Sequence, residues 1–326
     1  MKYEIRLLST AMLATAVAAA APHAAVGADD FPVSPVRVVV PYAAGGGGDI
    51  IARMLGAPLG EKWAQPVVTD NRPGAGTVIG TDLVAKAAPT GYTLLLNTAA
   101  ITINPGLLKK LPYDTLKDLM PVTQIAVLPN LLVVNPSLAV NSVKDLIDLA
   151  KKSPGLTYGS SGTGTVAHLA GELFRATAGI QLTHVPYKGG SALMPDLMAG
   201  RLQLTFATIP TSLAFVKSGK LKALAVASGR RSPTLPDVPT IAEAALPGFD
   251  ASNWIGMFAP ARTPTRIINF LQHEIAALVK DPEISVKMLT LGFEPTATTP
   301  AQFARIISAE LLKWKRVVET SGATSE

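Results

Sequence analysis

The chain has 326 residues, of which 48% are hydrophobic, with a net charge of +6 and no cysteine. This is the composition of a globular protein rather than of a disordered or collagen-like chain, and the length suits about two domains. The lack of cysteine excludes a disulfide framework, a thiolate zinc site, a cysteine nucleophile and a lipid attached to an N-terminal cysteine.

Residues 1–28 have the pattern of a secretory signal peptide. Lys2 and Arg6 provide a positive start, Leu7 to Ala21 is mostly apolar, and Val26-Gly27-Ala28 places small residues at a cleavage site. We therefore expect cleavage near Ala28 and export to the periplasm of a Gram-negative bacterium. The alternative is a membrane anchor, but the apolar stretch is shorter than the ~20 residues that a span needs.

The excess positive charge is scattered over the sequence. Basic pairs such as Lys109-Lys110 and Arg230-Arg231 stand far apart and have no interleaved aromatic residues. Because a nucleic-acid groove needs a concentrated stripe of charge, we expect no nucleic-acid partner. A mild surface preference for anionic ligands is compatible with this distribution.

Beyond residue 28, short apolar runs alternate with helical patterns, which favours an α/β fold. Residues 36–40 are a β-branched run and predict a buried parallel strand. Further strands are predicted at 67–69, 93–96, 122–127, 131–134, 156–158, 182–185, 202–207 and 221–227. Helices are predicted at 49–61, 79–87, 143–151, 165–177, 191–198, 211–217, 265–280 and 300–319, with a proline-rich linker at 233–239.

Two glycine-rich turns each follow a predicted strand and open a predicted helix. The first is 41–49 (PYAAGGGGD) and the second is 158–165 (YGSSGTGT). Glycine lets the backbone turn tightly, and the free N–H groups and dipole of a helix N-terminus favour negative charge. We infer that the two turns grip one anionic ligand between two domains. The alternative is that each turn is only a tight connector.

The motifs of other ligand-binding and catalytic sites are each incomplete in this sequence. Neither turn has the lysine of a P-loop, and 159–162 (GSSG) does not make a G-x-S-x-G nucleophile elbow. Residues 162–167 fit G-x-G-x-x-A, but no acidic residue ends the next strand. The histidines beyond residue 28 form no ligand cluster, and for His168 a ligand contact, a cap contact and core packing all stay open. We expect no catalytic residue, no metal site and no cofactor.

These motifs resemble those of the tripartite tricarboxylate transporter receptors, or Bug proteins, a family of periplasmic solute-binding proteins. The resemblance runs in order over essentially the whole chain beyond the signal peptide. The matching stretches are 39–53 (VVPYAAGGGGDIIAR), 71–76 (NRPGAG), 159–172 (GSSGTGTVAHLAGE), 186–190 (PYKGG), 231–233 (RSP), 235–240 (LPDVPT) and 254–260 (WIGMFAP).

The resemblance implies a two-domain α/β fold of the periplasmic-binding-protein, or Venus flytrap, type. Each domain is expected to be a mostly parallel sheet flanked by helices, with crossing strands as the hinge. Residues 29–129 and 250–326 would form domain 1, and residues 130–249 would form domain 2.

The resemblance also implies that the two turns hold a ligand carboxylate, largely through backbone N–H groups and bridging water. Lys188 is expected either to pair with a carboxylate or to stay an exposed lysine. Carried over residue by residue, the expected ligand-binding set is Tyr42, Ala44, Gly45, Gly46, Gly47, Gly48, Asp49, Thr98, Ser160, Ser161, Gly162, Thr163, Gly164, Thr165, His168, Tyr187, Lys188, Gly189, Ala207 and Thr208.

One departure from the family pattern bears on the ligand. After Phe206 the family usually has an Asp-Asn pair, whereas this chain has Ala207-Thr208. The missing carboxylate removes a natural partner for an ammonium group. We therefore hypothesise that the ligand is a plain mono- or dicarboxylate, aromatic ones included, rather than an amino acid.

The leading interpretation is a monomeric receptor that captures a small organic acid, closes by a hinge and presents the acid to large and small membrane subunits of a transporter. A second interpretation is that the closed protein engages a sensor-kinase ectodomain without transport. The third, an enzyme, is disfavoured because the chain lacks nucleophile and P-loop motifs.

Overall fold

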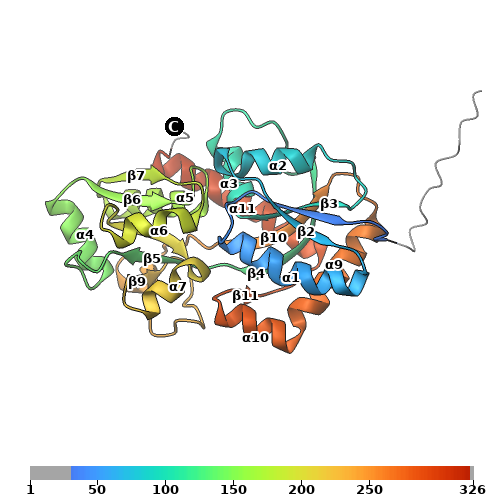
Figure 1. The fold of residues 1–326 in the computed structure, drawn as a ribbon. Coiled ribbons are helices and arrows are strands. Elements are labelled where there is room, and N and C mark those ends of the chain that lie inside the picture. The colour runs from blue at the N-terminus through green and yellow to red at the C-terminus, as the bar shows by residue number, and fades with distance from the viewer. Residues whose placement is uncertain (1–30, 324–326) are drawn as a thin grey trace, which may run out of the picture. The chain divides into compact units, whose positions relative to one another are not determined.

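A computed structural model describes residues 31–323, and the predicted signal peptide lies outside them. Helices and strands alternate along the chain (Figure 1). The strands are β1 (Val36–Val40), β2 (Val67–Asn71), β3 (Thr93–Thr98), β4 (Leu119–Val127), β5 (Asn130–Val134), β6 (Leu156–Ser160), β7 (Leu182–Pro186), β8 (Leu204–Thr208), β9 (Lys222–Val226), β10 (Trp254–Pro260) and β11 (Glu294–Pro295). The helices are α1 (Gly47–Trp63), α2 (Val78–Ala85), α3 (Ala100–Leu107), α4 (Val143–Lys152), α5 (Val166–Ala178), α6 (Gly190–Met198), α7 (Ile209–Lys217), α8 (Ile241–Ala244), α9 (Thr265–Lys280), α10 (Pro282–Thr290) and α11 (Pro300–Ser321), with a 3-10 turn at Ala75–Thr77.

Each predicted strand and helix has a counterpart within a few residues. Ser142 caps α4, since its Oγ accepts from the N–H of Asp145 at 3.1 Å. The sequence pattern missed α3, α8, α10, β10 and β11. Helix α3 contains Pro105 and several β-branched residues, which lower helix propensity. It forms because most of its residues are buried, so tertiary packing overrides local preference.

The strands form two sheets. The six-stranded first sheet has the order β11-β4-β10-β3-β1-β2, and the five-stranded second sheet has the order β7-β6-β8-β5-β9. In the first sheet β1 pairs in parallel with β2 and β3, whereas β10 and β11 pair antiparallel with their neighbours. In the second sheet β6 is parallel to β7 and β8, but β5 is antiparallel to β8 and β9. Four of the six strands in the first sheet and four of the five in the second therefore run in one direction, as expected, and the reversed strands β5, β10 and β11 make both sheets mixed.

The chain passes between the sheets twice, and the two passages are hydrogen-bonded to each other. Residues Leu128 and Pro129 link β4 to β5, and the chain returns just before β10. The N–H of Leu128 donates to the carbonyl of Asn253 at 2.9 Å, and Asn253 Nδ2 donates to Asn130 Oδ1 at 3.5 Å. Both asparagines are buried, so this connection is shielded from water.

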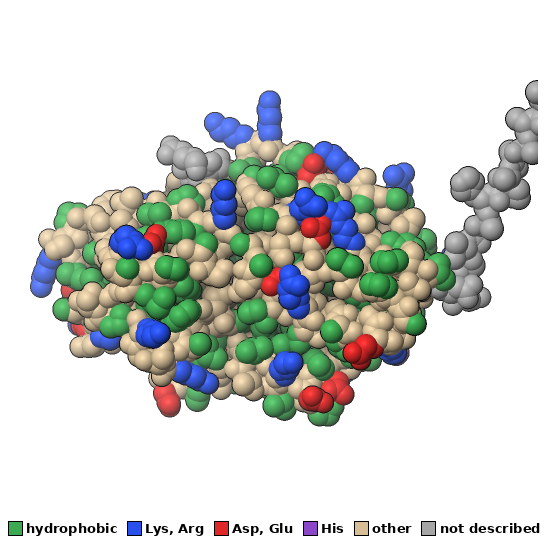
Figure 2. Space-filling view, in the orientation of Figure 1, with side chains coloured by type: hydrophobic (Ala, Val, Ile, Leu, Met, Phe, Trp, Pro, Cys, Tyr) green, Lys and Arg blue, Asp and Glu red, His purple; other side chains and the backbone are tan. Residues whose placement is uncertain are grey.

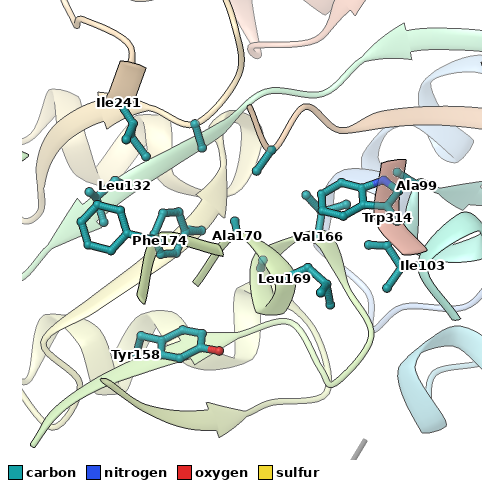
Figure 3. Packing of buried hydrophobic residues seen from close by; sticks show 14 of the residues in the cluster. Ala99, Ile103, Leu132, Tyr158, Val166, Leu169, Ala170, Phe174, Ile241 and Trp314 are labelled. Atoms are coloured by element: carbon teal, nitrogen blue, oxygen red, sulfur yellow. The ribbon is translucent and has the colours of Figure 1, made fainter. Parts of the chain in front are cut away.

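The C-terminal helix α11 joins core regions that belong to both sheets. Figure 3 shows Trp314 of α11 beside Ala99 and Ile103, with Val166 and Leu169 of α5 nearby, and all five belong to one buried cluster. The indole Nε1 of Trp314 is satisfied, because it donates to Glu310 Oε2 at 2.7 Å. This packing fixes the start of α5, which matters for the site described below.

Lys and Arg side chains on the face shown in Figure 2 are spread over the surface and interspersed with Asp and Glu. Among residues 31–323, no helix is both long and apolar enough to cross a membrane.

Candidate functional site

The parallel strands bring several turns to one edge of each sheet. In the first sheet the carboxyl ends of β1, β2 and β3 lead into the first glycine turn, the 71–77 turn and Thr98. In the second sheet the carboxyl ends of β6, β7 and β8 lead into the second glycine turn, the 187–189 segment and Thr208. Ligands of open α/β sheets bind beyond such ends, so these turns define the candidate site.

The first glycine turn is held by the carboxylate of Asp49. The N–H of Gly45 donates to Oδ2 at 3.0 Å, and Arg53 Nε donates to Oδ1 at 2.9 Å. Burial works to raise the pKa of Asp49, but the hydrogen bonds from Arg53 and Gly45 outweigh it and the pKa lies below its usual range. Both carboxylate oxygens are therefore engaged by the turn and by α1 rather than by a ligand.

The N-terminus of α1 has backbone N–H groups that form no hydrogen bond inside the helix. The first N–H to bond inside this helix is that of Ile50, which donates to the carbonyl of Gly46 at 3.0 Å. Within residues 31–323, no acceptor is found for the N–H groups of Gly47 and Gly48. These donors lie at the positive end of the helix dipole and suit an anion.

The second glycine turn is held by hydroxyls and an imidazole. Thr165 Oγ1 donates to the carbonyl of Gly162 at 2.6 Å, and the N–H of Gly162 donates to Ser160 Oγ at 3.1 Å. The N–H of Gly164 donates to Nδ1 of His168 at 3.2 Å. No carboxylate takes part in these hydrogen bonds, so the second turn is built from neutral groups.

The start of α5 repeats the arrangement of α1. Its first internal hydrogen bond runs from the N–H of Leu169 to the carbonyl of Thr165 at 3.1 Å, and Thr165 also caps the helix through its side chain. The N–H groups of Val166 and Ala167 find no acceptor among the described residues. A second set of free donors therefore stands at the end of a second dipole.

His168 and His184 support the second turn from behind. Their rings stack with centroids 4.2 Å apart, and His184 Nε2 lies 2.7 Å from Ser160 Oγ. Burial lowers the pKa of His168 to about 3 and that of His184 to about 4. The neutral His168 ring can therefore accept the hydrogen bond from Gly164 over the whole ordinary pH range.

Tyr42 and Thr98 form a wall of the site on the first sheet. Tyr42 Oη lies 2.7 Å from Thr98 Oγ1 and donates to Asn97 Oδ1 at 3.2 Å. Burial raises the pKa of Tyr42 far above its usual range, so the phenol stays protonated. The wall is thus polar and uncharged.

Two cavities, which share Tyr42, Ser161 and Thr165 as lining residues, lie among these turns. The inner cavity measures ≈ 50 Å³, and the outer cavity measures ≈ 510 Å³. The inner cavity is lined by Tyr42, Gly46, Gly47, Gly48, Thr98, Leu128, Asn130, Ser161, Thr165, Val166, Ala167, Gly190, Leu193, Thr205, Phe206, Ala207, Thr208, Thr211 and Asn253. The outer cavity is lined by Pro41, Tyr42, Pro73, Gly74, Ala75, Gly76, Thr77, Val78, Leu108, Lys110, Ser161, Gly162, Thr163, Thr165, Pro186, Tyr187 and Lys188.

The turns of the two sheets touch each other beside the cavities. Ser191 Oγ donates to the carbonyl of Ala44 at 3.2 Å. A Cβ on Gly76 would overlap the carbonyl oxygen of Thr163, and a Cβ on Gly164 would overlap Asn104 Oδ1. Glycine at 76 therefore permits a close approach to the backbone of Thr163, and glycine at 164 leaves room for the Asn104 side chain; both contacts join segments that belong to different sheets.

The structure divides the expected ligand-binding residues into three groups. Those lining the inner cavity are Tyr42, Gly46, Gly47, Gly48, Thr98, Ser161, Thr165, Ala207 and Thr208. Those found at the outer cavity are Tyr42, Ser161, Gly162, Thr163, Thr165, Tyr187 and Lys188. Those lining neither are Ala44, Gly45, Asp49, Ser160, Gly164, His168 and Gly189. His168 instead lines a separate cavity of ≈ 370 Å³ with Glu172, Arg175 and His184.

Several residues that line the two cavities are not in the ligand-binding set expected from the sequence. Asn130, Thr205, Thr211 and Asn253 place polar groups at the inner cavity, and Lys110 places an ammonium at the outer one. Residues 73–76 of the 71–76 motif also line the outer cavity, a placement that the motif alone does not predict. Asn130, Thr205, Thr211, Asn253 and Lys110 could be predicted only from their positions near strand ends and crossings. Those positions become known only once the order of the strands in each sheet is known.

The charges of the two cavities differ. The residues that line the inner cavity include no Lys, Arg, His, Asp or Glu, whereas the outer cavity has Lys110 and Lys188 as its charged residues. Within the described chain, no group of three His, Asp or Glu residues is placed to hold a metal ion. The arrangement can bind an anion by hydrogen bonds and dipoles, but it contains no nucleophile beside a base at the inner cavity.

Two mixed sheets, joined by two crossings and enclosing a cavity at their strand ends, define a binding protein of the periplasmic type. The chain belongs to the tripartite tricarboxylate transporter receptor family, whose model matches residues 51–323. It is similar to protein BugT of Bordetella pertussis, with 37% identity over 316 residues that cover 96% of this chain and 97% of that protein. The family predicted from the motifs is thereby confirmed, and it is a family of binding proteins rather than enzymes.

Solved structures support the same assignment. The R. palustris protein Rpa4515 with adipate has a TM-score of 0.87 and 38% identity, covering 90% of this chain and 99% of that one. MatC from Rhodopseudomonas palustris with bound malate has a TM-score of 0.84 and 30% identity, covering 88% of this chain and 100% of that one. The α/β binding-protein fold expected from the sequence is confirmed by these matches.

Proposed function

We propose that this protein captures a small organic carboxylate in the inner cavity. The observation that carries the proposal is the convergence of two helix N-termini, Gly47-Gly48 of α1 and Val166-Ala167 of α5, on one cavity without a charged lining residue. An anion there is compensated by free N–H donors and two helix dipoles rather than by an ion pair. Such hydrogen bonds strengthen where water is excluded.

Dicarboxylates are the favoured class of ligand. Among the similar solved structures, Rpa4515 holds adipate and MatC holds malate, and both ligands are dicarboxylates. The inner cavity offers no carboxylate to an ammonium group, since Ala207 and Thr208 line it with a methyl and a hydroxyl. An unpaired buried ammonium is costly, so we expect amino acids such as aspartate to bind more weakly than the matching plain acids.

We further propose that the protein works by domain closure, with residues 29–129 and 250–326 as one domain and residues 130–249 as the other. The hinge would lie at the crossings, where Asn130 and Asn253 meet. The closed, loaded monomer would present its ligand to large and small membrane subunits of a transporter. Uptake of labelled ligand by cells that carry both membrane subunits should therefore require this protein.

The proposed place of work is the periplasm, after removal of the signal peptide near Ala28. Mass spectrometry of the protein from a periplasmic extract should give a chain that begins close to Asp29. Full-length protein retained in the cytosol would contradict this part of the proposal.

Calorimetry with a matched panel tests the binding proposal. Succinate, malate, adipate and terephthalate are compared with their diamides and with aspartate and glutamate. We expect at least one dicarboxylate to bind with a micromolar or lower Kd, and its diamide to show no binding. The proposal fails if every carboxylate is inert or if the diamides bind as tightly as the acids.

A further inference from the structure

Residues 74–77 form a turn with an unfavourable backbone conformation. All four residues have positive φ, with values of +131°, +46°, +59° and +83° in chain order. Glycine adopts left-handed backbone easily, but the same conformation is unfavourable for Ala75 and for the β-branched Thr77. Of the five non-glycine residues with positive φ among residues 31–323, two lie in this turn. Such a conformation persists only where the surrounding structure holds it.

Asn104 of α3 supplies much of that support. Its Nδ2 donates to the carbonyl of Gly76 at 2.9 Å and to Thr77 Oγ1 at 3.3 Å. Thr81 of α2 adds a further bond, because its Oγ1 donates to the carbonyl of Thr77 at 2.8 Å.

The helix that carries Asn104 is held by the core. The Asn104 side chain is completely buried. Its neighbour Ile103 belongs to the same buried cluster as Trp314 of α11 (Figure 3). The support for the 74–77 turn is therefore anchored on a fixed element and not on another loop.

The 74–77 turn and Asn104 together meet the second glycine turn. A Cβ on Gly76 would overlap the carbonyl oxygen of Thr163, and a Cβ on Gly164 would overlap Asn104 Oδ1. Residues 163–164 directly precede Thr165, the N-cap of α5, and the first residues of α5 line the inner cavity. A displacement of the 74–77 turn would therefore change how the donors of the second sheet are seated against the first sheet.

Asn104 itself is not placed to contact a ligand. It lines neither the inner nor the outer cavity, and its Nδ2 already donates to the turn. Any effect of Asn104 on ligand binding must therefore pass through the contact between the two turns.

We propose that Asn104 is a positioning residue for ligand binding, which keeps the 74–77 turn left-handed so that Gly76 seats against Thr163 when the two sheets enclose the ligand. This inference rests on the proposed function and extends it from the ligand contacts to a residue that never touches the ligand. Without Asn104 the turn relaxes toward ordinary backbone angles, and the closed form loses population. The apparent Kd rises in inverse proportion to that population.

The expected loss of affinity on removing Asn104 is about tenfold. One buried neutral hydrogen bond changes an equilibrium by about fivefold, and Asn104 makes two with the turn. Part of this loss falls on the unliganded protein, which contains the same turn, so the full product of the two factors is not expected.

Calorimetry with adipate, or with the tightest acid of the panel, compares Asn104→Ala with the unmodified protein. Asn135→Ala is the matched control, because Asn135 is also buried and its Nδ2 donates to the carbonyls of Leu197 and Met198 at 2.7 and 3.0 Å. Asn135 lines neither cavity. Thermal unfolding records how much stability each variant loses.

A second variant separates positioning from general support of the fold. Ala75→Gly removes the unfavourable left-handed alanine, so the turn needs less support from Asn104. The double variant A75G/N104A should therefore bind the acid more tightly than N104A. If N104A does not fold, Thr77→Val takes its place with and without A75G, because it removes the Oγ1 that accepts from Asn104.

We expect N104A to weaken binding about tenfold, the double variant to recover part of that loss, and N135A to lower stability with an unchanged Kd. The positioning role is overturned, while the proposed function stands, by an unchanged Kd for N104A, by equal losses for N104A and N135A, or by a double variant no tighter than N104A. If the unmodified protein binds no acid of the panel, the proposed function fails together with this inference.

Discussion

The first glycine turn is held by a buried carboxylate, whereas the second is held by an imidazole and two hydroxyls. In the first, Asp49 accepts from Gly45 and Arg53, and in the second, His168 accepts from Gly164. Both turns nevertheless leave the first N–H groups of their helices free at the same cavity. The comparison supports the proposal that binding depends on the shared backbone geometry, because two different sets of side chains hold the two turns.

The two turns also differ in how closely they approach the other sheet. A Cβ on Gly45 of the first turn would come no nearer than 3.9 Å to Ser191, whereas Thr163 and Gly164 of the second turn touch Gly76 and Asn104 closely. Closure should therefore depend more strongly on glycine around the second turn. The predictions below test this contrast and the difference in support, from the largest expected effect to the smallest.

We expect Gly76→Ala to reduce ligand affinity about 100-fold or more. Gly76 has φ +59°, and its added Cβ would meet the backbone carbonyl of Thr163, which cannot move aside without shifting the turn. Gly45→Ala is the matched variant, because Gly45 has φ +77° but meets only Ser191 at 3.9 Å. Both carry the left-handed cost of about 1–2 kcal/mol for alanine, seen in thermal unfolding.

Calorimetry with the best dicarboxylate separates the two glycine variants. Gly179→Ala, at φ +62° with open space around it, controls for the backbone cost alone. Equal affinities for the Gly76 and Gly45 variants would contradict the idea that the second turn sets the closest approach.

We expect His168→Ala to lower the free energy of unfolding by about 2–3 kcal/mol, because it opens a cavity beside His184 and leaves the N–H of Gly164 without an acceptor. His168→Asn should recover part of both stability and ligand affinity, since Asn Oδ1 can stand where Nδ1 stood. Urea unfolding and calorimetry measure the two. If the asparagine variant is no better than the alanine variant, His168 contributes packing and not turn support.

Because histidine holds the second turn and a carboxylate holds the first, the two turns should contribute differently to the pH dependence of stability. The pKa values of His168 and His184 are about 3 and 4 in the folded protein because of burial, against about 6.5 in the unfolded chain. The unfolded state therefore binds more protons below pH 6.5, and stability should fall as the pH drops from about 6.5 toward 4. Glu172 and Arg175 line the same cavity, and the charge of Glu172 acts to raise the pKa of His184.

Urea unfolding between pH 7 and 4.5 measures this slope. His168→Asn should flatten it, whereas Asp49→Asn should not, because the lowered pKa of Asp49 makes its contribution disappear only below about pH 4. A slope that depends on Asp49 and not on His168 would reverse the roles assigned to the two turns.

The smallest effects are expected at the first turn. Asp49→Asn keeps an acceptor for Gly45 and should cost about 1 kcal/mol of stability. Arg53→Met should cost less than that, because the Arg53 side chain is 57% exposed and its ion pair with Asp49 is screened. Thermal unfolding of both variants at low and high salt checks the order. A larger loss for the arginine variant would mean that Arg53 supports the turn by packing.

Much of the fold could be predicted because its signals are local. Residues 36–40 are β-branched and form β1, and Ser142 caps α4 as its sequence position suggests. The glycine turns could be predicted for the same reason, since each joins a strand to a helix. Helix α3 could not, because burial rather than propensity stabilises it.

The partners inside the site could not be predicted because they are distant in sequence or ambiguous locally. Asn130 and Asn253 form a hydrogen bond although they are 123 positions apart in the sequence, and no pattern near either residue predicts this contact. Lys109 and Lys110 are adjacent and chemically identical, yet they line different cavities. The sequence around His168 is compatible with a ligand contact, a cap contact and core packing, and in the structure its Nδ1 accepts from the N–H of Gly164.

The central claim is that free N–H groups of two helices bind one carboxylate together. Amide resonances followed by ¹⁵N NMR during titration with adipate, or with the tightest acid of the panel, test it most directly. The account predicts that the amides of Gly47, Gly48, Val166 and Ala167 show the largest shifts and saturate with a single Kd. Saturable binding that shifts only one of the two helices, or neither, would contradict it.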